Sequence, residues 1–220
     1  MRNRMSDTPL EPSEFKRGPG GRPTREEAER RHRSLLATAF RLFLDKGWAG
    51  VSIEEISRAS GVAKGFIYAR YADKDTLFTE AIERLMTDVM GTLHLAEPLP
   101  DDVEQGLLAL GRKMLDVALR PEALAFYRQF LAEAGRLQEL ARHFVEHNPL
   151  LALISEVLCG YAERGAIAVG DPRLMAEHFA TLVVGVPRIR ALFVGREPPA
   201  EEERRLQAAV RLFLDGCRMA

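Results

Sequence analysis

The fold is decided by the stretch Val51-Ser-Ile-Glu-Glu-Ile-Ser-Arg-Ala-Ser-Gly-Val-Ala-Lys-Gly-Phe-Ile-Tyr-Ala-Arg-Tyr-Ala-Asp-Lys74. Its apolar spacing predicts two short helices, and a close crossing between them needs a small residue in the first, which Ser57 supplies. The turn needs a residue that tolerates positive φ, which Gly61 supplies, and Ile67 fixes the inner face of the second helix. Two short helices joined in this way predict a helix-turn-helix, which we place at residues 53–72.

The outward face of the second helix has the composition of a surface that contacts DNA. It is short-chained, basic and aromatic, with Lys64, Gly65, Phe66, Tyr68, Ala69 and Arg70. Such a surface can lie in a major groove, where side chains meet base edges and phosphates. Residues 1–75 hold 15 Lys and Arg against 11 Asp and Glu, whereas the rest of the chain holds 16 against 21. The more basic part of the chain therefore contains the motif.

The rest of the sequence also predicts helices. Capping boxes at Thr24-x-x-Glu27 and Ser52-x-x-Glu55 open the first two, Gly47 ends the first, and Asp73 caps a fourth over 74–91. Apolar periodicity predicts further helices over 102–119, 121–134, 136–147, 149–164, 172–194 and 200–217. Pro187 should kink the fifth of these or end it early. No run alternates as a strand does, so we expect an all-α protein of nine or ten helices.

Composition excludes several classes of protein. The chain has 220 residues, of which 46% are hydrophobic and 29% charged, so it can bury a core and is neither mostly disordered nor collagen-like. Cys159 and Cys217 are too few for a secreted disulfide framework. The sequence contains neither an apolar run of membrane-spanning length nor a signal-peptide core. We therefore expect a soluble cytoplasmic protein that binds no membrane.

At this point the sequence resembles the TetR-type transcriptional regulators. The resemblance rests on Leu42-Phe43-x-x-x-Gly47, Ser52-Ile53-x-x-Ile56 and Ala59-x-Gly61-Val62-x-Lys64-Gly65-x-Ile67-Tyr68-x-x-Tyr71-x-x-Lys74-x-x-Leu77. Segments at 126–133, 140–144 and Asp171-Pro172 are similar to the AefR-like branch. Phe66 departs from the family pattern, in which Thr or Ser is more frequent. Because Phe offers only apolar contact, for instance to a thymine methyl group, the base preference cannot be carried over.

The resemblance implies a three-helix DNA-binding head joined to a larger helical domain that binds an effector and dimerises. We divide the chain into a disordered basic tail (1–23), a DNA-binding domain (24–91) and an effector-binding and dimerisation domain (92–220). The implied function is that of a homodimeric regulator on a palindromic double-stranded operator, expected to be a repressor released by a small hydrophobic effector. No cofactor, metal or catalytic residue is expected. Arg17, Arg22 and Arg25, which flank Gly-Pro-Gly-Gly, belong either to a minor-groove arm or to a solvated linker.

Three sets of residues are expected to carry this function. Base or groove contacts are expected from Lys64, Gly65, Phe66 and Ala69, and phosphate contacts from Ser52, Tyr68, Arg70 and Lys74. A surface ion pair with the neighbouring aspartates is an alternative for Lys74. An effector pocket is expected to be lined by Met114, Phe126, Tyr127, Phe130, Phe144, Tyr161, Met175 and His178. A dimer interface is expected from Leu182, Val183, Val186, Ile189, Phe193 and Leu212, with simple burial in one subunit as the alternative.

Two other functions compete with a regulator. His143-Phe-Val-Glu146-His147 matches the H-x-x-E-H pattern of inverted zinc proteases, in which two histidines bind zinc and the glutamate acts as general base. A third ligand is not evident, and Asn148-Pro149 ends the helix at once, so a polar helix end is favoured. The second alternative is a helical protein that binds a small molecule and has no DNA function.

Overall fold

The computed structural model describes residues 24–93, 98–133, 135, 138, 142 and 146–217, and every regular element within them is a helix. The first part contains α1 (Arg25–Lys46), α2 (Ile53–Ser60), α3 (Lys64–Arg70) and α4 (Lys74–Leu93). The second part contains α5 (Val103–Ala118), α6 (Pro121–Glu133), α8 (Pro149–Glu163), α9 (Pro172–Ala180), the π-helical segment η1 (Thr181–Gly185), α10 (Val186–Phe193) and α11 (Pro199–Gly216). The all-α prediction is confirmed. The tail at 1–23 and most of the predicted helix at 136–147 lie outside the described residues.

Capping side chains fix where the first two helices begin. The Thr24 hydroxyl accepts from the Glu27 backbone N–H at 3.2 Å, and the Glu27 carboxylate accepts from the Thr24 N–H at 3.1 Å, so the first predicted capping box is complete. Ser52 accepts from the Glu55 N–H at 3.2 Å. The Glu55 carboxylate pairs with Lys46 on α1 instead of returning to Ser52. The second box is therefore half formed, because a cation from another helix competes for its acid.

A π-helical segment precedes Pro187, where a kink or an early helix end was predicted. α9 continues into η1, and Pro187 then occupies the first turn of α10. Proline has no N–H to donate and its ring crowds the preceding turn, so a wider π turn before it relieves the conflict. The predicted segment at 172–194 is thus continuous but changes its helical type.

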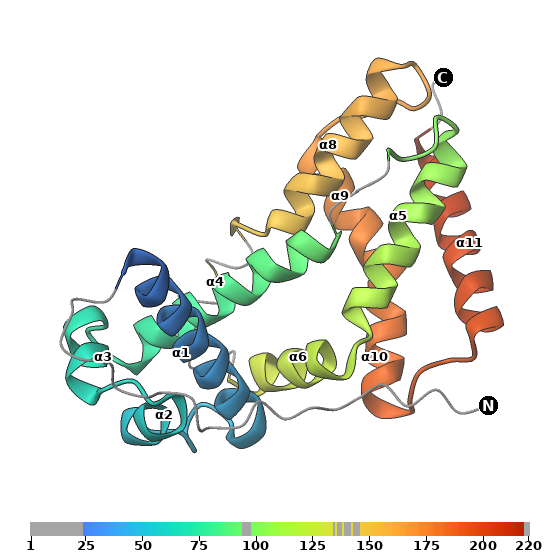
Figure 1. Cartoon of the computed structure of the whole chain (residues 1–220). Helices are drawn as coiled ribbons and strands as arrows, with labels where there is room; N and C mark the ends of the chain where they lie inside the picture. The colour runs from blue at the N-terminus through green and yellow to red at the C-terminus, as the bar shows by residue number, and fades with distance from the viewer. Residues whose placement is uncertain are drawn as a thin grey trace, which may run out of the picture.

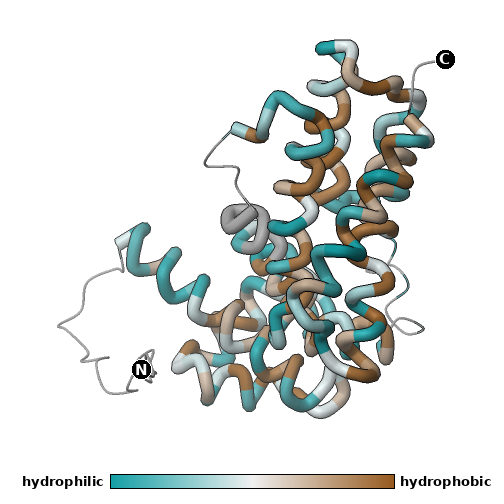
Figure 2. The backbone as a smooth tube through the Cα atoms, turned by 90° about the vertical axis from the view of Figure 1, so that its right-hand side faces the viewer, coloured by the Kyte–Doolittle hydropathy of each residue, from teal (hydrophilic) through white to brown (hydrophobic). Residues whose placement is uncertain are grey.

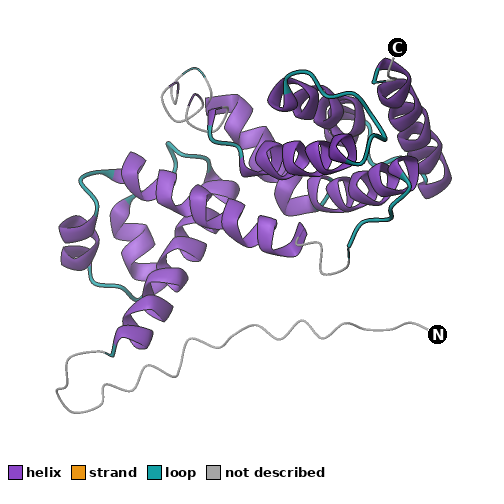
Figure 3. Ribbon diagram, turned by 90° about the horizontal axis from the view of Figure 1, so that it is seen from above, coloured by secondary structure: helices purple, strands orange, loops and turns teal. Residues whose placement is uncertain are grey.

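Two clusters of buried apolar side chains hold the described helices together. One lies among α1–α4 and runs from Leu35 to Ile82, and the other lies among α5, α8, α9, η1 and α11 and runs from Leu107 to Cys217. Hydrophilic and hydrophobic residues follow one another along the helices, as the colours of Figure 2 show. Figure 1 shows α4 running from the first group of helices toward the second, and Figure 3 shows the same two groups from above. The domain boundary after residue 91 stays a prediction. No helix within the described ranges is long and apolar enough to cross a membrane.

Helix α6 joins the two parts by a second route. It follows α5 in the chain, yet the ring of its Phe126 packs on Phe40 of α1 with ring centres 5.8 Å apart. On the next turn, the Gln129 side-chain amide donates to the Leu44 carbonyl oxygen at 3.4 Å. Both α4 and α6 therefore connect the second part to α1.

Candidate nucleic-acid interface

The crossing of α2 and α3 has the predicted helix-turn-helix geometry. Gly61 ends α2 in the left-handed conformation, with φ 68° and ψ 11°, which glycine adopts without strain. The Ser57 hydroxyl donates to the Val62 carbonyl oxygen at 2.7 Å and so binds the turn to α2. Ile67 is 0% exposed at the centre of the first cluster. The turn, the small residue and the apolar anchor all occupy the predicted places.

The other side of α3 is uncovered. Phe66 and Tyr68 are each 50% exposed, although large aromatic side chains are usually covered. Lys64, Gly65, Ala69 and Arg70 are exposed beside them. The Lys64 ammonium lies 5.5 Å from the centre of the Tyr68 ring. All six residues expected on the outward side of α3 are thus exposed, and Ile67 is the buried residue of this helix.

Carboxylates from other helices face the two cations of α3. Lys64 pairs with Glu54 on α2, and Arg70 pairs with Glu80 on α4 at 3.2 Å. The hydrogen bond from Lys64 raises the pKa of the Lys64 ammonium and lowers the pKa of Glu54. Both pairs are exposed, so water and salt screen them and they contribute little to stability. Sequence patterns did not single out Glu54 or Glu80, because their pairing depends on how separate helices cross.

Lys74 makes contacts within the subunit that the sequence did not predict. Its ammonium donates to the backbone carbonyl oxygens of Trp48 and Val51, both at 2.8 Å, and lies 3.5 Å from the Trp48 ring centre. The cation therefore ties the start of α4 to the chain between α1 and α2. These contacts give Lys74 a part in positioning the motif, and its expected phosphate contact stays a prediction.

Tyr71 anchors the end of α3 in the interior. It is 2% exposed, and its hydroxyl lies 2.6 Å from the ring nitrogen Nε2 of His32 on α1. Burial raises the pKa of Tyr71 to about 12, so the hydroxyl keeps its proton. The same His32 nitrogen lies 3.2 Å from the Glu80 carboxylate, and burial lowers the pKa of His32. Tyr71 lies one turn beyond Ile67 on the same face, a spacing that predicts a core residue and agrees with this position.

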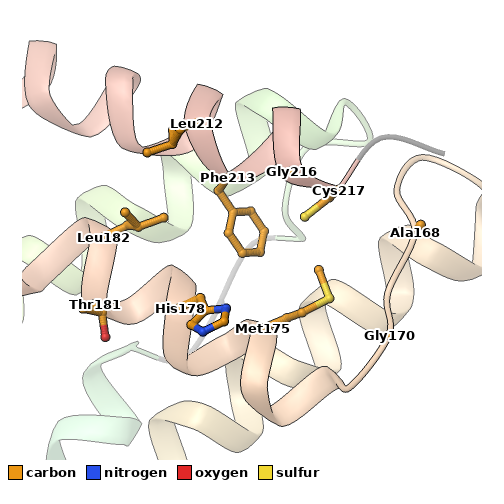
Figure 4. Close-up of a pocket in the computed structure, with 10 residues that line it drawn as sticks. All are labelled: Ala168, Gly170, Met175, His178, Thr181, Leu182, Leu212, Phe213, Gly216 and Cys217. Carbon is orange, nitrogen blue, oxygen red and sulfur yellow. The ribbon is translucent and has the colours of Figure 1, made fainter. Parts of the chain in front are cut away.

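A groove opens in the second part, between α9 with η1 and α11 (Figure 4). It has a volume of about 620 Å³ and is lined by Ala168, Gly170, Met175, His178, Thr181, Leu182, Leu212, Phe213, Gly216 and Cys217. Two of the expected pocket residues, Met175 and His178, are among them. The volume is in the range of small-molecule sites.

The remaining expected pocket residues lie elsewhere. Met114 and Tyr161 are 2% and 1% exposed inside the second cluster, where the Tyr161 hydroxyl donates to the Pro100 carbonyl oxygen at 2.6 Å. On α6, the rings of Phe126 and Phe130 lie tilted to each other with ring centres 5.7 Å apart, and Tyr127 contacts Arg188 of α10. Phe144 lies outside the described residues. The described members of the expected pocket are therefore divided among the groove, the second cluster and α6.

Four of the six residues expected at a dimer interface are exposed. Val186 is 50% exposed, Ile189 53% and Phe193 83% on α10, and Leu212 is 63% exposed on α11. Leu182 is partly buried at the groove. Val183 is 2% exposed and packs in the second cluster, so its side chain serves the subunit's own core, which is the alternative of burial in one subunit.

The zinc motif gains no support from its described members. Glu146 and His147 are exposed and lie just before α8 in the chain. His143 lies outside the described residues. Where side chains are described, no group of three His, Cys, Asp or Glu residues is placed to hold a metal ion.

Comparison with known proteins decides the family. Residues 35–81 match the pattern of bacterial regulatory proteins of the tetR family, and residues 105–216 match the C-terminal domain of the AefR-like transcriptional repressors. The chain belongs to the TetR family. It is a TetR-family transcriptional regulator with an N-terminal helix-turn-helix, and the family is one of regulators and not of enzymes.

Relatives share different lengths of this TetR-family chain. The regulator AcrR of Shigella flexneri is 39% identical over 74 residues, which is 34% of either chain, so the similarity spans about a third of that relative. The regulator EthR of Mycobacterium tuberculosis is 22% identical over 201 residues, covering 89% of this chain and 90% of EthR. A solved TetR-family regulator from Mesorhizobium loti is 31% identical, with a TM-score of 0.76 over 90% of this chain and 100% of that one. The flavonoid-responsive regulator FrrA is 26% identical, with a TM-score of 0.69 over 86% of this chain and 98% of FrrA.

Proposed function

We propose that this regulator binds a palindromic operator as a homodimer, with α3 of each subunit in the major groove. The observation that carries the proposal is the uncovered face of α3, where two half-exposed aromatic rings lie beside two cations while Ile67 is fully buried. We assign contacts with base edges or the groove to Lys64, Gly65, Phe66 and Ala69, and phosphate contacts to Ser52, Tyr68, Arg70 and Lys74. One such motif reads only a few base pairs, so a second copy on the other half-site supplies affinity.

Gly65 supports a close approach of DNA to α3. A Cβ atom at this position would meet nothing within 4 Å in the subunit, so packing does not require glycine. Glycine inside a helix costs about 1 kcal/mol relative to alanine. A close approach of the DNA backbone or bases to the helix would explain why glycine stands here, which packing within the subunit does not.

Ser52 is suited to a phosphate contact. Its hydroxyl oxygen accepts from the Glu55 N–H, which leaves the hydroxyl hydrogen to donate outward. The side chain is exposed at the start of α2. For Lys64 and Arg70, DNA binding exchanges a screened carboxylate partner for a phosphate or a base acceptor.

Lys64→Ala should relax recognition at one operator position. If Lys64 donates to a guanine, its loss costs about 1–3 kcal/mol on the preferred operator and much less where that base is changed. Binding-site selection with wild type, followed by titration of single-base operator variants, measures both effects. Lys113→Ala, in α5, is the matched control and should leave every affinity unchanged. An equal loss on all operator variants would remove Lys64 from base recognition.

Arg70→Gln should weaken all sequences alike. A lost phosphate contact removes one released counterion, so the slope of log affinity against log salt should fall by about one. Titration of the selected operator and of a random duplex over a salt series measures this slope. A loss confined to the selected operator would show that Arg70 reads sequence instead.

For control, we propose a repressor that a small apolar effector releases from DNA. The effector must bind the arrangement that cannot bind DNA more tightly, and DNA must then weaken effector binding by the same factor. Helix α4 contacts α1 on one side and α5 and α8 on the other, so it is a route for this coupling. The groove beside Met175 and His178 is a candidate effector site. That Phe144 lines an effector pocket stays a prediction. Because FrrA is described as responsive to flavonoids, a flavonoid is the first compound to test for release of the operator.

A further inference from the structure

Arg188 on α10 carries a charge that its surroundings do not balance. Its guanidinium carbon lies 4.6 Å from the centre of the Tyr127 ring on α6. Within the described part of the chain, no carboxylate acts on Arg188, and Tyr127 is the group that favours its charge. Arg190, two residues further on, pairs with the Glu197 carboxylate at 2.6 Å. Of the two arginines on α10, Arg190 therefore has a carboxylate partner and Arg188 has none among the described residues.

The guanidinium of Arg188 is also partly removed from water. This burial lowers the pKa of Arg188, while Tyr127 acts in the opposite direction. A guanidinium has five N–H donors in a planar fork, of which one tyrosine hydroxyl can satisfy only a part. A desolvated cation without an anion is unfavourable, and an anion placed beside it is attracted strongly. The side chain keeps an intermediate exposure, so a solute can reach it.

We propose that Arg188 is the polar end of an effector site between α6 and α10, and that it binds the carboxylate of an aromatic monoanion. This inference rests on the proposed regulation by an effector, and it offers a site and an effector class distinct from the groove beside Met175 and His178. The guanidinium fork matches a carboxylate through two parallel hydrogen bonds. The Tyr127 ring offers an aromatic wall for the body of the ligand. A doubly charged phosphate would leave one negative charge without a partner, so a carboxylate fits better.

The same site has a direct route to the DNA-binding helices. Phe126, the residue before Tyr127, packs on Phe40 of α1, and Gln129 donates to the Leu44 carbonyl oxygen. Helix α6 therefore contacts Arg188 on one side and the DNA-binding part on another. A ligand that changes the distance between α6 and α10 shifts α6 against α1, and so alters operator affinity without requiring α4.

Calorimetry with 2-naphthoate and its neutral analogue 2-naphthamide tests the site. We expect the full-length wild type to bind naphthoate at least about tenfold more tightly than naphthamide, because only the acid pairs with the guanidinium. Arg188→Met, which keeps an apolar stem, should lose about tenfold or more of the naphthoate affinity and bind the amide as the wild type does. Arg204→Met removes an exposed arginine of α11 and should change neither affinity.

Folding and oligomeric state distinguish a ligand-binding Arg188 from a structural one. Arg188→Met should melt at no lower temperature than wild type, because an unbalanced buried cation does not stabilise the fold. A lower melting temperature with unchanged naphthoate affinity would make Arg188 a structural residue, and dissociation of the dimer without naphthoate binding would assign it to a carboxylate of the partner subunit. Should the Met variant not fold, Arg188→Lys must lower the affinity for naphthoate and not for the amide. Absence of naphthoate binding by wild type up to about 10 mM also overturns the site. Failure of the proposed function is distinct, since it would appear as equal affinity for selected and random DNA before any ligand is added.

Discussion

Replacing Gly106 with alanine should destabilise the protein by about 3 kcal/mol or more, because the new methyl group has no room. A Cβ at this position of α5 would lie 1.6 Å from the Tyr161 hydroxyl oxygen and 2.6 Å from the ring carbon that bears it. Tyr161 cannot withdraw cheaply, since it is 1% exposed and donates to the Pro100 carbonyl oxygen at 2.6 Å. The substitution therefore either displaces α5 from α8 or breaks a buried hydrogen bond. Urea unfolding followed by circular dichroism measures the loss.

Gly160→Ala is the matched control for Gly106→Ala. Gly160 also lies inside a helix, and the nearest atom to its Cβ, on the Arg164 side chain, is 3.8 Å away. This variant should be more stable than wild type by about 0.5–1 kcal/mol, the usual gain for alanine over glycine in a helix. Gly106→Ala should also cost less in a Tyr161→Leu background. Equal stability of the two alanine variants would show that Tyr161 does not press on Gly106.

The double variant Val186→Glu with Phe193→Glu should be a folded monomer. Val186 and Phe193 lie on α10 with 50% and 83% of their surface exposed, in line with the proposed dimer interface. Charges there would be desolvated in a dimer and solvated in a monomer, so only association suffers. Loss of the second head should lower operator affinity by about 10²–10⁴-fold, the usual advantage of two linked binding sites. Sedimentation equilibrium and operator titration measure the two effects.

Leu131→Glu is the control for this double variant. Leu131 is 54% exposed on α6. The substitution therefore adds a charge at a comparably exposed residue outside α10 and α11. This variant should remain a dimer and keep its operator affinity. A double variant that still sediments as a dimer would refute the proposed interface. A dimer that buried these two positions could not tolerate two carboxylates without partners.

Helix positions and faces were predictable because they depend on local rules. Thr24 and Gly47 bound α1 as predicted, and Asp73 accepts from the Thr76 N–H at 2.7 Å at the start of α4. Ile67 was recognised as the anchor of α3 from its spacing alone, and it is fully buried. Capping, glycine turns and apolar periodicity each act within a few residues of sequence.

Partnerships between helices were not predictable in the same way. Lys74 binds carbonyl oxygens 23 and 26 residues away, at Val51 and Trp48, and no local pattern distinguishes that cation from a phosphate ligand. Val183 lies on a helix with several apolar sides, and which side meets the core depends on α5 and α11. The lining of an effector pocket cannot be predicted from the sequence for the same reason, because aromatic residues at helical spacing serve packing between helices as readily as a cavity. The expected pocket stays a prediction.

The most direct test of the central claim, that α3 reads DNA sequence, is the ratio of two dissociation constants. A duplex enriched by selection with the full chain, and a random duplex of equal length, are titrated by fluorescence anisotropy at one salt concentration near physiological. The uncovered face of α3 predicts that the selected duplex binds about 10³-fold more tightly or better, and that Lys64→Ala lowers this ratio. Equal dissociation constants for the two duplexes would contradict sequence-specific recognition by this chain.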